Sequence, residues 1–278
     1  MKRGELVLLC DERLYAALSA RLQAHHCACT MLRVCASAEP SAVAADWLCT
    51  RAGRQARIVL NLCSISSDIS VALNTDLKRR NVAYLDAPLT GNLQDGKQGK
   101  LTVIVSGSAA AFALAKPALE VIGKRVFYMG KKPGAAQVMQ QINSSLASTL
   151  LAVACEIYVT GIKAGLTAKA MAQIFSNGSG RNAASAEIVP QQVVTRRFNH
   201  GKRIADAHKE LTLMNQEADR RGVTMWVGGK TRQLYGLAAQ LGKPQDDITR
   251  LVTHYEKWAK VKVQAAVQVS RNKRAIDS

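Results

Sequence analysis

Apolar residues in the first half of the chain alternate between short continuous runs and helically spaced positions. The short runs are typical of buried strands and predict strands over residues 5–10, 27–34, 57–62, 82–86, 101–106 and 125–129. Helical spacing predicts helices between them, over residues 13–24, 42–51, 68–80 and 109–122. This alternation indicates an α/β domain whose largely parallel sheet carries helices on both faces.

The second half of the chain has a different, almost entirely helical pattern. Residues 137–164 form one long Ala-rich helical pattern without Pro, and further helices are predicted over residues 168–176, 208–221, 230–241 and 246–263. The Pro133-Gly134 pair makes a joint before the long helix. We therefore predict a sheet domain over residues 1–133 and an all-α domain over residues 134–278, which is built on the long interdomain helix and ends in a frayed tail.

The charge of the chain is strongly positive but evenly spread. Lys and Arg outnumber Asp and Glu by 38 to 20, which gives a formal net charge of +18. The first fifty residues are neutral, and the excess is distributed over the rest. This spread and the 5% aromatic content argue against a nucleic-acid partner. The densest basic cluster is interpreted as a solvated tail, and it consists of Lys257, Lys260, Lys262, Arg271, Lys273 and Arg274.

Several other functions are not indicated by the sequence. No apolar stretch approaches the roughly 20 residues that cross a bilayer, and the start of the chain does not resemble a secretory signal, so we expect a cytoplasmic protein without a membrane segment. The seven cysteines have no regular disulfide framework, as in a reducing compartment. Residues 25–29 (HHCAC), with Cys35, offer zinc-ligand types at the wrong spacing, so we expect no metal.

Several segments resemble the β-hydroxyacid dehydrogenase family, which includes 3-hydroxyisobutyrate, tartronate semialdehyde and 6-phosphogluconate dehydrogenases. They are residues 84–92 (YLDAPLTGN), 99–107 (GKLTVIVSG), 130–143, 156–166, 208–211 and 241–247, in the family's order. The resemblance covers about residues 57–261. It implies a shortened Rossmann-like domain followed by a helical domain that builds a homodimer, NADP or NAD as cofactor, and oxidoreduction of a small hydroxy acid or imine.

The family's cofactor loop is replaced in this chain. In the family, the first strand leads into G-x-G-x-x-G, whose backbone approaches the diphosphate at a helix N-terminus. Alignment of residues 16–22 with the family's first helix places Cys10, Glu12 and Tyr15 at the glycine positions. Two charges about 4 Å apart repel by roughly 1 to 4 kcal/mol, so Asp11 and Glu12 would oppose a diphosphate. At the start of a helix, both residues also serve as ordinary capping residues.

The adenosine side of the cofactor site is also expected to differ from the family's. The chain is shorter than the family between residues 34 and 57, where the middle crossover of the nucleotide domain falls. No acidic residue ends the second predicted strand to hold a ribose. Arg33 lies nearby and is a candidate for a 2′-phosphate, although an exposed surface charge is the more ordinary interpretation.

The family's catalytic lysine is replaced as well. The family's long helix begins G-x-G-x-x-x-K-x-x-N, where the Lys exchanges a proton with the substrate hydroxyl and the Asn holds it. The segment from Gly134 to Asn143 places Gln140 at the Lys position. An amide forms hydrogen bonds but does not titrate near neutral pH. Asn143 and Ser144 remain as polar groups, and they either bind a ligand or simply face a wet cleft.

The substrate-binding segment is better kept. Thr90-Gly91-Asn92 matches the family's Ser-Gly-Gly, which holds the substrate carboxylate, and Lys209 matches a Lys that faces the cleft. Two readings follow from these residues. The chain is either a divergent NAD(P)-dependent oxidoreductase, or a catalytically inactive or cofactor-independent dimeric scaffold that binds small anions.

Overall fold

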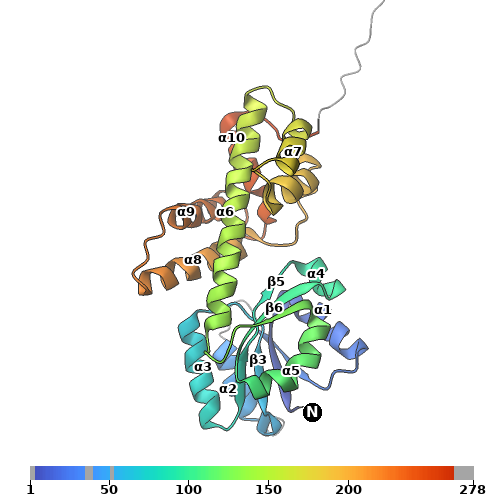
Figure 1. The fold of residues 1–278 in the computed structure, drawn as a ribbon, viewed down its shortest axis with the longest axis vertical. Coiled ribbons are helices and arrows are strands. Elements are labelled where there is room, and N and C mark those ends of the chain that lie inside the picture. The colour runs from blue at the N-terminus through green and yellow to red at the C-terminus, as the bar shows by residue number, and fades with distance from the viewer. Residues whose placement is uncertain (1–3, 35–39, 51–52, 266–278) are drawn as a thin grey trace, which may run out of the picture. The chain divides into compact units, whose positions relative to one another are not determined.

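The computed structural model describes residues 4–34, 40–50 and 53–265 of the chain (Figure 1). The chain forms two compact units. The first consists of Met1–Ser148 and Gly201–Gln245, and the second of Thr149–His200 and Asp246–Ser278. The secondary structure changes from sheet to helix near the predicted boundary after residue 133, while the compact units divide the chain elsewhere, so that boundary stays a prediction.

A seven-stranded sheet forms the centre of the first unit. Its strands are β1 (Leu6–Asp11), β2 (Thr30–Val34), β3 (Ile58–Asn61), β4 (Ala83–Asp86), β5 (Leu89–Thr90), β6 (Leu101–Gly107) and β7 (Gly123–Tyr128). They pair in the order β2-β1-β3-β4-β6-β5, with β7 also pairing to β6. The first four strands in this order are parallel, whereas β6 is antiparallel to β4 and β5. The predicted strands and the parallel-dominated fold class are confirmed, and β5 is a strand that the sequence pattern did not predict.

The helices of the sheet region lie on both faces of the sheet (Figure 1). They are α1 (Glu12–Ala24), α2 (Pro40–Leu48), α3 (Ser67–Arg79), α4 (Leu93–Gln98) and α5 (Ala109–Ile122). Alternate residues of β1 separate two cores. Leu6 and Leu8 pack with α1 and α5, while Val7 and Leu9 pack with α2 and α3. Successive side chains of a strand point to opposite faces of the sheet. An apolar run without polar positions therefore forms a strand that is buried on both faces.

All other regular elements of the described chain are helices or helical turns. They are α6 (Ala135–Lys163), α7 (Ala168–Asn177), the π-helix η2 (Ala184–Val194), α8 (Ile204–Arg220), α9 (Trp226–Leu241), the 3-10 turn η3 (Ile248–Arg250) and α10 (Leu251–Ala259). The prediction of one helix over residues 246–263 was wrong. Asp247 caps the short turn η3, and α10 ends where Lys260 adopts a left-handed φ of 55°.

The structure also bears on the expectations about membrane segments, cysteines and metal ligands. By length and composition α6 is apolar enough to cross a membrane, but half of its most apolar window is buried in the protein, as in core helices. The six cysteines that the structure describes are free thiols. Within residues 4–34, 40–50 and 53–265, no group of three or more His, Cys, Asp or Glu side chains could hold a metal ion. Cys35 and the frayed tail predicted over residues 270–278 lie outside the described residues, whereas Lys257, Lys260 and Lys262 of the basic cluster lie within them and are exposed.

A buried carboxylate ties α3 to α8 within the first unit. The Glu217 side chain is 1% exposed and accepts hydrogen bonds from Ser67 Oγ at 2.7 Å, Arg221 Nε at 2.8 Å and Arg220 Nη2. Burial by itself raises the pKa of Glu217, but these hydrogen bonds outweigh it and lower the pKa to about 2. The carboxylate therefore stabilises the fold in its ionised form.

The Glu217→Gln variant is expected to make stability less sensitive to acid. A depressed carboxyl pKa contributes stability that is complete above the unfolded-state pKa and is lost as pH falls toward about 2. We expect the wild type to exceed the variant by about 2 kcal/mol in unfolding free energy at neutral pH, with a smaller difference near pH 3. Urea unfolding at both pH values measures the two unfolding free energies. An equal difference between wild type and variant at both pH values would contradict the expectation.

Candidate functional site

Five polar side chains form one hydrogen-bonded cluster between the start of α6 and α8. We call Ser64, Gln140, Ser144, Lys202 and Glu210 the Lys202 cluster. The Glu210 carboxylate accepts from Gln140 Nε2 at 3.1 Å, from Lys202 Nζ at 2.5 Å and from Ser144 Oγ. Lys202 Nζ also donates to Ser144 Oγ at 2.8 Å, and Ser64 Oγ donates to Gln140 Oε1 at 3.0 Å. The Lys202 ammonium and the Gln140 amide therefore donate to the same carboxylate, that of Glu210.

The first turns of α6 are fixed to the loop that follows β3. Gln137 Oε1 accepts from Ile65 N at 3.1 Å, Gln137 Nε2 donates to Cys63 O at 3.1 Å, and Gln141 Nε2 donates to Ile65 O at 2.8 Å. Both glutamines are fully buried. Gln140 lies between them in sequence, so its place in the Lys202 cluster is set by backbone contacts on either side.

Asp86, at the end of β4, connects the sheet to the same helix. It is fully buried and accepts four hydrogen bonds: from Tyr84 Oη at 2.7 Å, Gly134 N at 2.7 Å, Gln137 Nε2 at 3.1 Å and Ser70 Oγ. The carboxylate thus joins β4 and α3 to the residues that begin α6. Since buried polar groups need partners, this network fixes the position at which α6 leaves the sheet.

The Thr90-Gly91-Asn92 segment is a tight loop leading into α4. Gly91 has a φ of 134°, and a Cβ atom there would lie 2.7 Å from Leu101 Cδ2, so both the conformation and the space require glycine. Asn92 caps α4 through Asp95 N at 3.0 Å. Thr90 Oγ1 is buried without a hydrogen-bond partner in the described part of the chain. A buried hydroxyl without a partner is uncommon in folded proteins, and a bound water or ligand is one way to satisfy it.

Gly201 places Lys202 beside this loop. A Cβ atom added at Gly201, whose φ is 91°, would lie only 3.3 Å from Asn92 Cβ and 3.6 Å from Leu93 N. The backbone of Gly201 therefore packs directly against the start of α4. The Lys202 cluster and the Thr90 loop are consequently neighbours within the first unit.

The N-terminus of α1 is closed by its own side chains. Asp11 Oδ1 accepts from Arg13 N at 2.9 Å, which occupies a backbone donor of the first turn. The Arg13 side chain forms an ion pair with Asp206 of α8 and donates to Gly201 O at 2.8 Å. Glu12 is exposed on the first turn. Two carboxylates and a capped N–H therefore stand at this helix start.

The other residues predicted from the cofactor motif are not gathered into a polar site. Cys10 is buried, and burial raises the pKa of its thiol. Tyr15 packs partly against the core, with its hydroxyl 3.5 Å from Met31 O. Arg33 is exposed and pairs in register with Cys10. These residues belong to the sheet and to the helix that packs on it.

Two residues predicted for the substrate side, Asn143 and Lys209, are not members of the Lys202 cluster. Asn143 is half-buried, and no hydrogen bond links it to the described residues of the cluster. Lys209 is exposed and lies close enough to Cys63 to act on it electrostatically. Burial raises the pKa of Cys63 to about 12, and Lys209 opposes that rise. The structure therefore brings together Gln140 and Ser144, while Ser64, Lys202 and Glu210 are members that the candidate site residues did not include.

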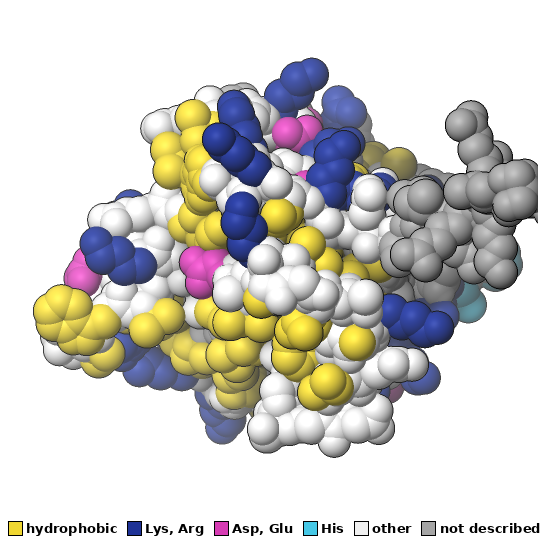
Figure 2. Space-filling view, turned by 90° about the horizontal axis from the view of Figure 1, so that it is seen from above, with side chains coloured by type: hydrophobic (Ala, Val, Ile, Leu, Met, Phe, Trp, Pro, Cys, Tyr) yellow, Lys and Arg dark blue, Asp and Glu magenta, His cyan; other side chains and the backbone are white. Residues whose placement is uncertain are grey.

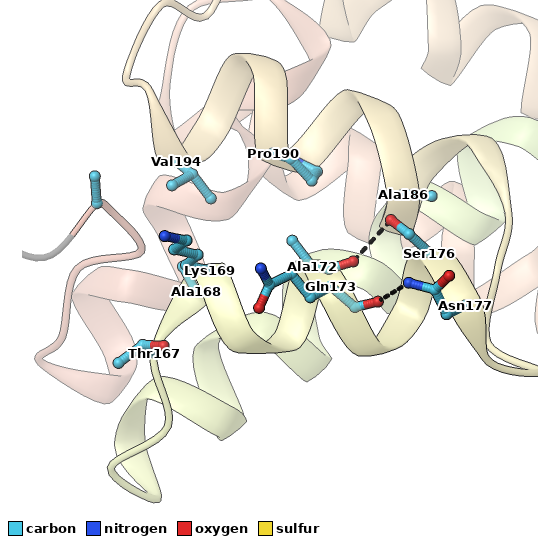
Figure 3. A pocket seen from close by; sticks show the side chains of 11 residues that line it. Thr167, Ala168, Lys169, Ala172, Gln173, Ser176, Asn177, Ala186, Pro190 and Val194 are labelled. Carbon is cyan, nitrogen blue, oxygen red and sulfur yellow. Dashed lines mark hydrogen bonds between the residues drawn. The ribbon is translucent and has the colours of Figure 1, made fainter.

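A cavity of about 800 Å³ lies in the second unit between α7 and η2 (Figure 3). Its lining residues are Thr167, Ala168, Lys169, Ala172, Gln173, Ser176, Asn177, Ala186, Pro190, Val194 and Ala265. None of the site residues predicted from the sequence lines it. The cavity is therefore separate from the chemistry that the sequence indicated.

Basic side chains on the face shown in Figure 2 are scattered among hydrophobic and other side chains and do not merge into one patch. This distribution agrees with the even spread of charge along the sequence. The prediction that nucleic acid is not a partner stays a prediction.

Family models match both halves of the chain. The NAD binding domain of 6-phosphogluconate dehydrogenase matches residues 4–130, and the NAD-binding domain of NADP-dependent 3-hydroxyisobutyrate dehydrogenase matches residues 134–255. The two matches follow one another in the order that the resemblance implied and together account for most of the chain.

Curated relatives point to the same family at low identity. The chain is 25% identical to 2-(hydroxymethyl)glutarate dehydrogenase from Eubacterium barkeri, over 74% of this chain and 68% of that protein. It is 30% identical to 3-hydroxyisobutyrate dehydrogenase from Pseudomonas aeruginosa, over 58% of this chain and 56% of that protein. The aligned regions thus leave about a third or more of each relative unmatched.

Solved structures share the fold. Psf3, in a complex with NADP+ and 2-OPP, has a TM-score of 0.75 at 20% identity and covers 90% of this chain and 99% of its own. The 3-hydroxyisobutyrate dehydrogenase of Mycobacterium tuberculosis has a TM-score of 0.73 at 16% identity, over 92% of this chain and 99% of its own. These similarities, with the two family models, show that the chain belongs to the β-hydroxyacid dehydrogenase family, whose cofactor is NAD(P).

Proposed function

We propose that this chain binds a small carboxylic acid, such as a hydroxy acid, and does so without using NAD(P). The observation that carries the proposal is the closed, acidic start of α1. Family membership implies NAD(P) as cofactor. The proposal therefore depends on whether the residues at the start of α1 can bind a dinucleotide.

The residues at the start of α1 do not fit a diphosphate in the place that the family uses. A diphosphate is bound there by free backbone N–H groups and by close approach to a backbone without side chains. Asp11 already occupies Arg13 N, and Glu12 adds a second carboxylate to the first turn. The Arg13 guanidinium, which would favour an anion, is held by Asp206 and Gly201 O. Repulsion and competition for donors therefore both oppose the cofactor.

The residues for a small carboxylate are better preserved. Thr90 supplies a buried hydroxyl without a partner among the described residues, and Gly91 gives the loop, through its φ of 134°, a conformation that favours glycine. Lys209 is an exposed cation on α8 in the same unit. A hydroxyl, a glycine loop and an ammonium group of the same unit form the kind of donor set that binds a carboxylate. The free thiols of the described cysteines also suit the cytoplasm that we propose as its location.

Calorimetric titration with 3-hydroxyisobutyrate tests the binding proposal. We expect a saturable heat for the acid and no heat for methyl 3-hydroxyisobutyrate, which differs by one methyl group and carries no charge. Equal binding of acid and ester, or no binding of either, would contradict the proposal.

A second candidate function is the family's own activity, NAD(P)-dependent oxidoreduction of a hydroxy acid or imine. The match to the family models over both halves favours it, as does the Lys202 ammonium, which binds the same Glu210 carboxylate as Gln140. Consumption of NADPH with an oxo acid or imine, measured by absorbance, distinguishes this function from binding alone.

We also propose that the protein is a homodimer through α6. Apolar side chains exposed at helical spacing on α6 support this, with Leu146 59%, Val153 46% and Ile157 47% exposed. Sedimentation of the wild type as a dimer and of Leu146→Lys as a monomer is the expected result. A monomeric wild type would reject the proposal.

A further inference from the structure

Lys202 is a half-buried cation whose position is fixed by the cluster around it. Its side chain is 21% exposed, and that of Glu210 is 15% exposed. The Lys202 ammonium donates to Glu210 Oε2 at 2.5 Å and to Ser144 Oγ at 2.8 Å. A lysine on an open surface would not be held by two partners, and a partly buried charge is less screened by salt than an exposed one.

One N–H donor of the Lys202 ammonium is not used within the cluster. An ammonium has three N–H donors, and the described contacts use two of them. Glu210 is occupied, because its two oxygens accept from Gln140, Ser144 and Lys202. Ser144 both donates to Glu210 and accepts from Lys202. Unused donors of the cluster therefore remain at Lys202 and at the second N–H of Gln140 Nε2, and of the two only Lys202 carries the positive charge that attracts an anion.

An unused acceptor or donor also exists on the neighbouring loop. Thr90 Oγ1 is buried without a partner, and Gly201, which precedes Lys202, packs against Asn92 of the same loop. Two groups without a full set of partners, a hydroxyl and an ammonium, thus belong to adjacent segments. A carboxylate is the small group that accepts from both.

We propose that Lys202 is the residue that recognises the carboxylate of the bound acid, together with Thr90. This inference rests on the proposed function, since it names the recognition residue of that same site. Glu210 holds the ammonium in place and competes with the ligand for its charge. Ser144 and Gln140 orient Glu210, so they are positioning residues that do not themselves bind the carboxylate.

The test compares variants by calorimetric titration with 3-hydroxyisobutyrate. Lys202→Met, which keeps an unbranched side chain one atom shorter and without the charge, is expected to weaken binding about tenfold or more, and Lys202→Arg to keep part of it. Lys116→Met is the matched control, because Lys116 lies on α5 in an exposed pair with Glu120 at 3.7 Å. Circular dichroism of each variant confirms that it is folded.

Glu210→Gln provides a readout that a purely structural lysine would not give. Removal of the competing negative charge is expected to tighten binding of the acid a few-fold, and the wild-type affinity is expected to fall with added salt more steeply than that of Lys202→Met. Unchanged affinity in folded Lys202→Met, with binding intact in the wild type, would overturn the role of Lys202 and leave the proposed function standing. Absence of binding in the wild type itself would overturn both.

Discussion

Replacement of Thr90 by Val is expected to stabilise the protein and, at the same time, to weaken its binding of 3-hydroxyisobutyrate. Val has the shape of Thr without the hydroxyl. Thr90 Oγ1 is buried with no partner among the described residues, so its removal relieves a desolvation cost and should raise the unfolding free energy by about 1 kcal/mol. Loss of a hydrogen bond to a carboxylate should weaken binding by about 10- to 100-fold.

Urea unfolding and calorimetry of the same preparation measure the two effects. Thr75→Val is the matched control, because Thr75 is exposed on α3 and bonds only to Val71 O at 2.9 Å. We expect the control to change neither quantity appreciably. A Thr90→Val variant that is less stable than the wild type, or one that binds the acid equally well, would show that the hydroxyl serves the fold and not a ligand.

Replacement of Asp86 by Ala is expected to lower the unfolding free energy by about 3 kcal/mol or more. The variant leaves buried donors from Ser70, Tyr84, Gly134 and Gln137 without their common acceptor, and each such group costs about 1 to 3 kcal/mol when it finds no other partner. Because the same carboxylate fixes the start of α6, weaker acid binding should accompany the loss of stability.

Asp76→Ala on the same unit gives the comparison for Asp86. Asp76 is 66% exposed and pairs with Arg79 at 3.4 Å on the surface of α3. Its loss is expected to change the unfolding free energy by about 0.5 kcal/mol or less. If chemical denaturation gave similar values for both variants, the Asp86 network would not be the joint between β4 and α6.

The fold could largely be predicted from the sequence because its signals are local. The run from Leu6 to Cys10 has the uninterrupted apolar pattern of a strand buried on both faces, and the Ala-rich pattern of α6 has neither Pro nor an early Gly. The short elements β5 and α4 give no such periodic signal. The predicted last helix was too long because a left-handed residue at Lys260, which the pattern does not reveal, ends α10.

The candidate site could be predicted only in part, because its members come from distant segments. Gln140 and Ser144 lie one turn apart on one helix, and both are among the site residues that the sequence predicts. Lys202 joins them through Glu210 and through the packing of Gly201 on Asn92, which are contacts between residues far apart in the chain. No motif around Lys202 marks it, so only the three-dimensional arrangement shows that its ammonium and the Gln140 amide bind the same carboxylate, that of Glu210.

Titration with NADPH is the most direct test of the proposal that this family member works without its family's cofactor. Asp11 and Glu12 at the start of α1, together with the occupied Arg13 N–H, predict no saturable binding tighter than millimolar by calorimetry or by nucleotide fluorescence, with or without 3-hydroxyisobutyrate present. Saturable binding of NADPH in the micromolar range would contradict the proposal.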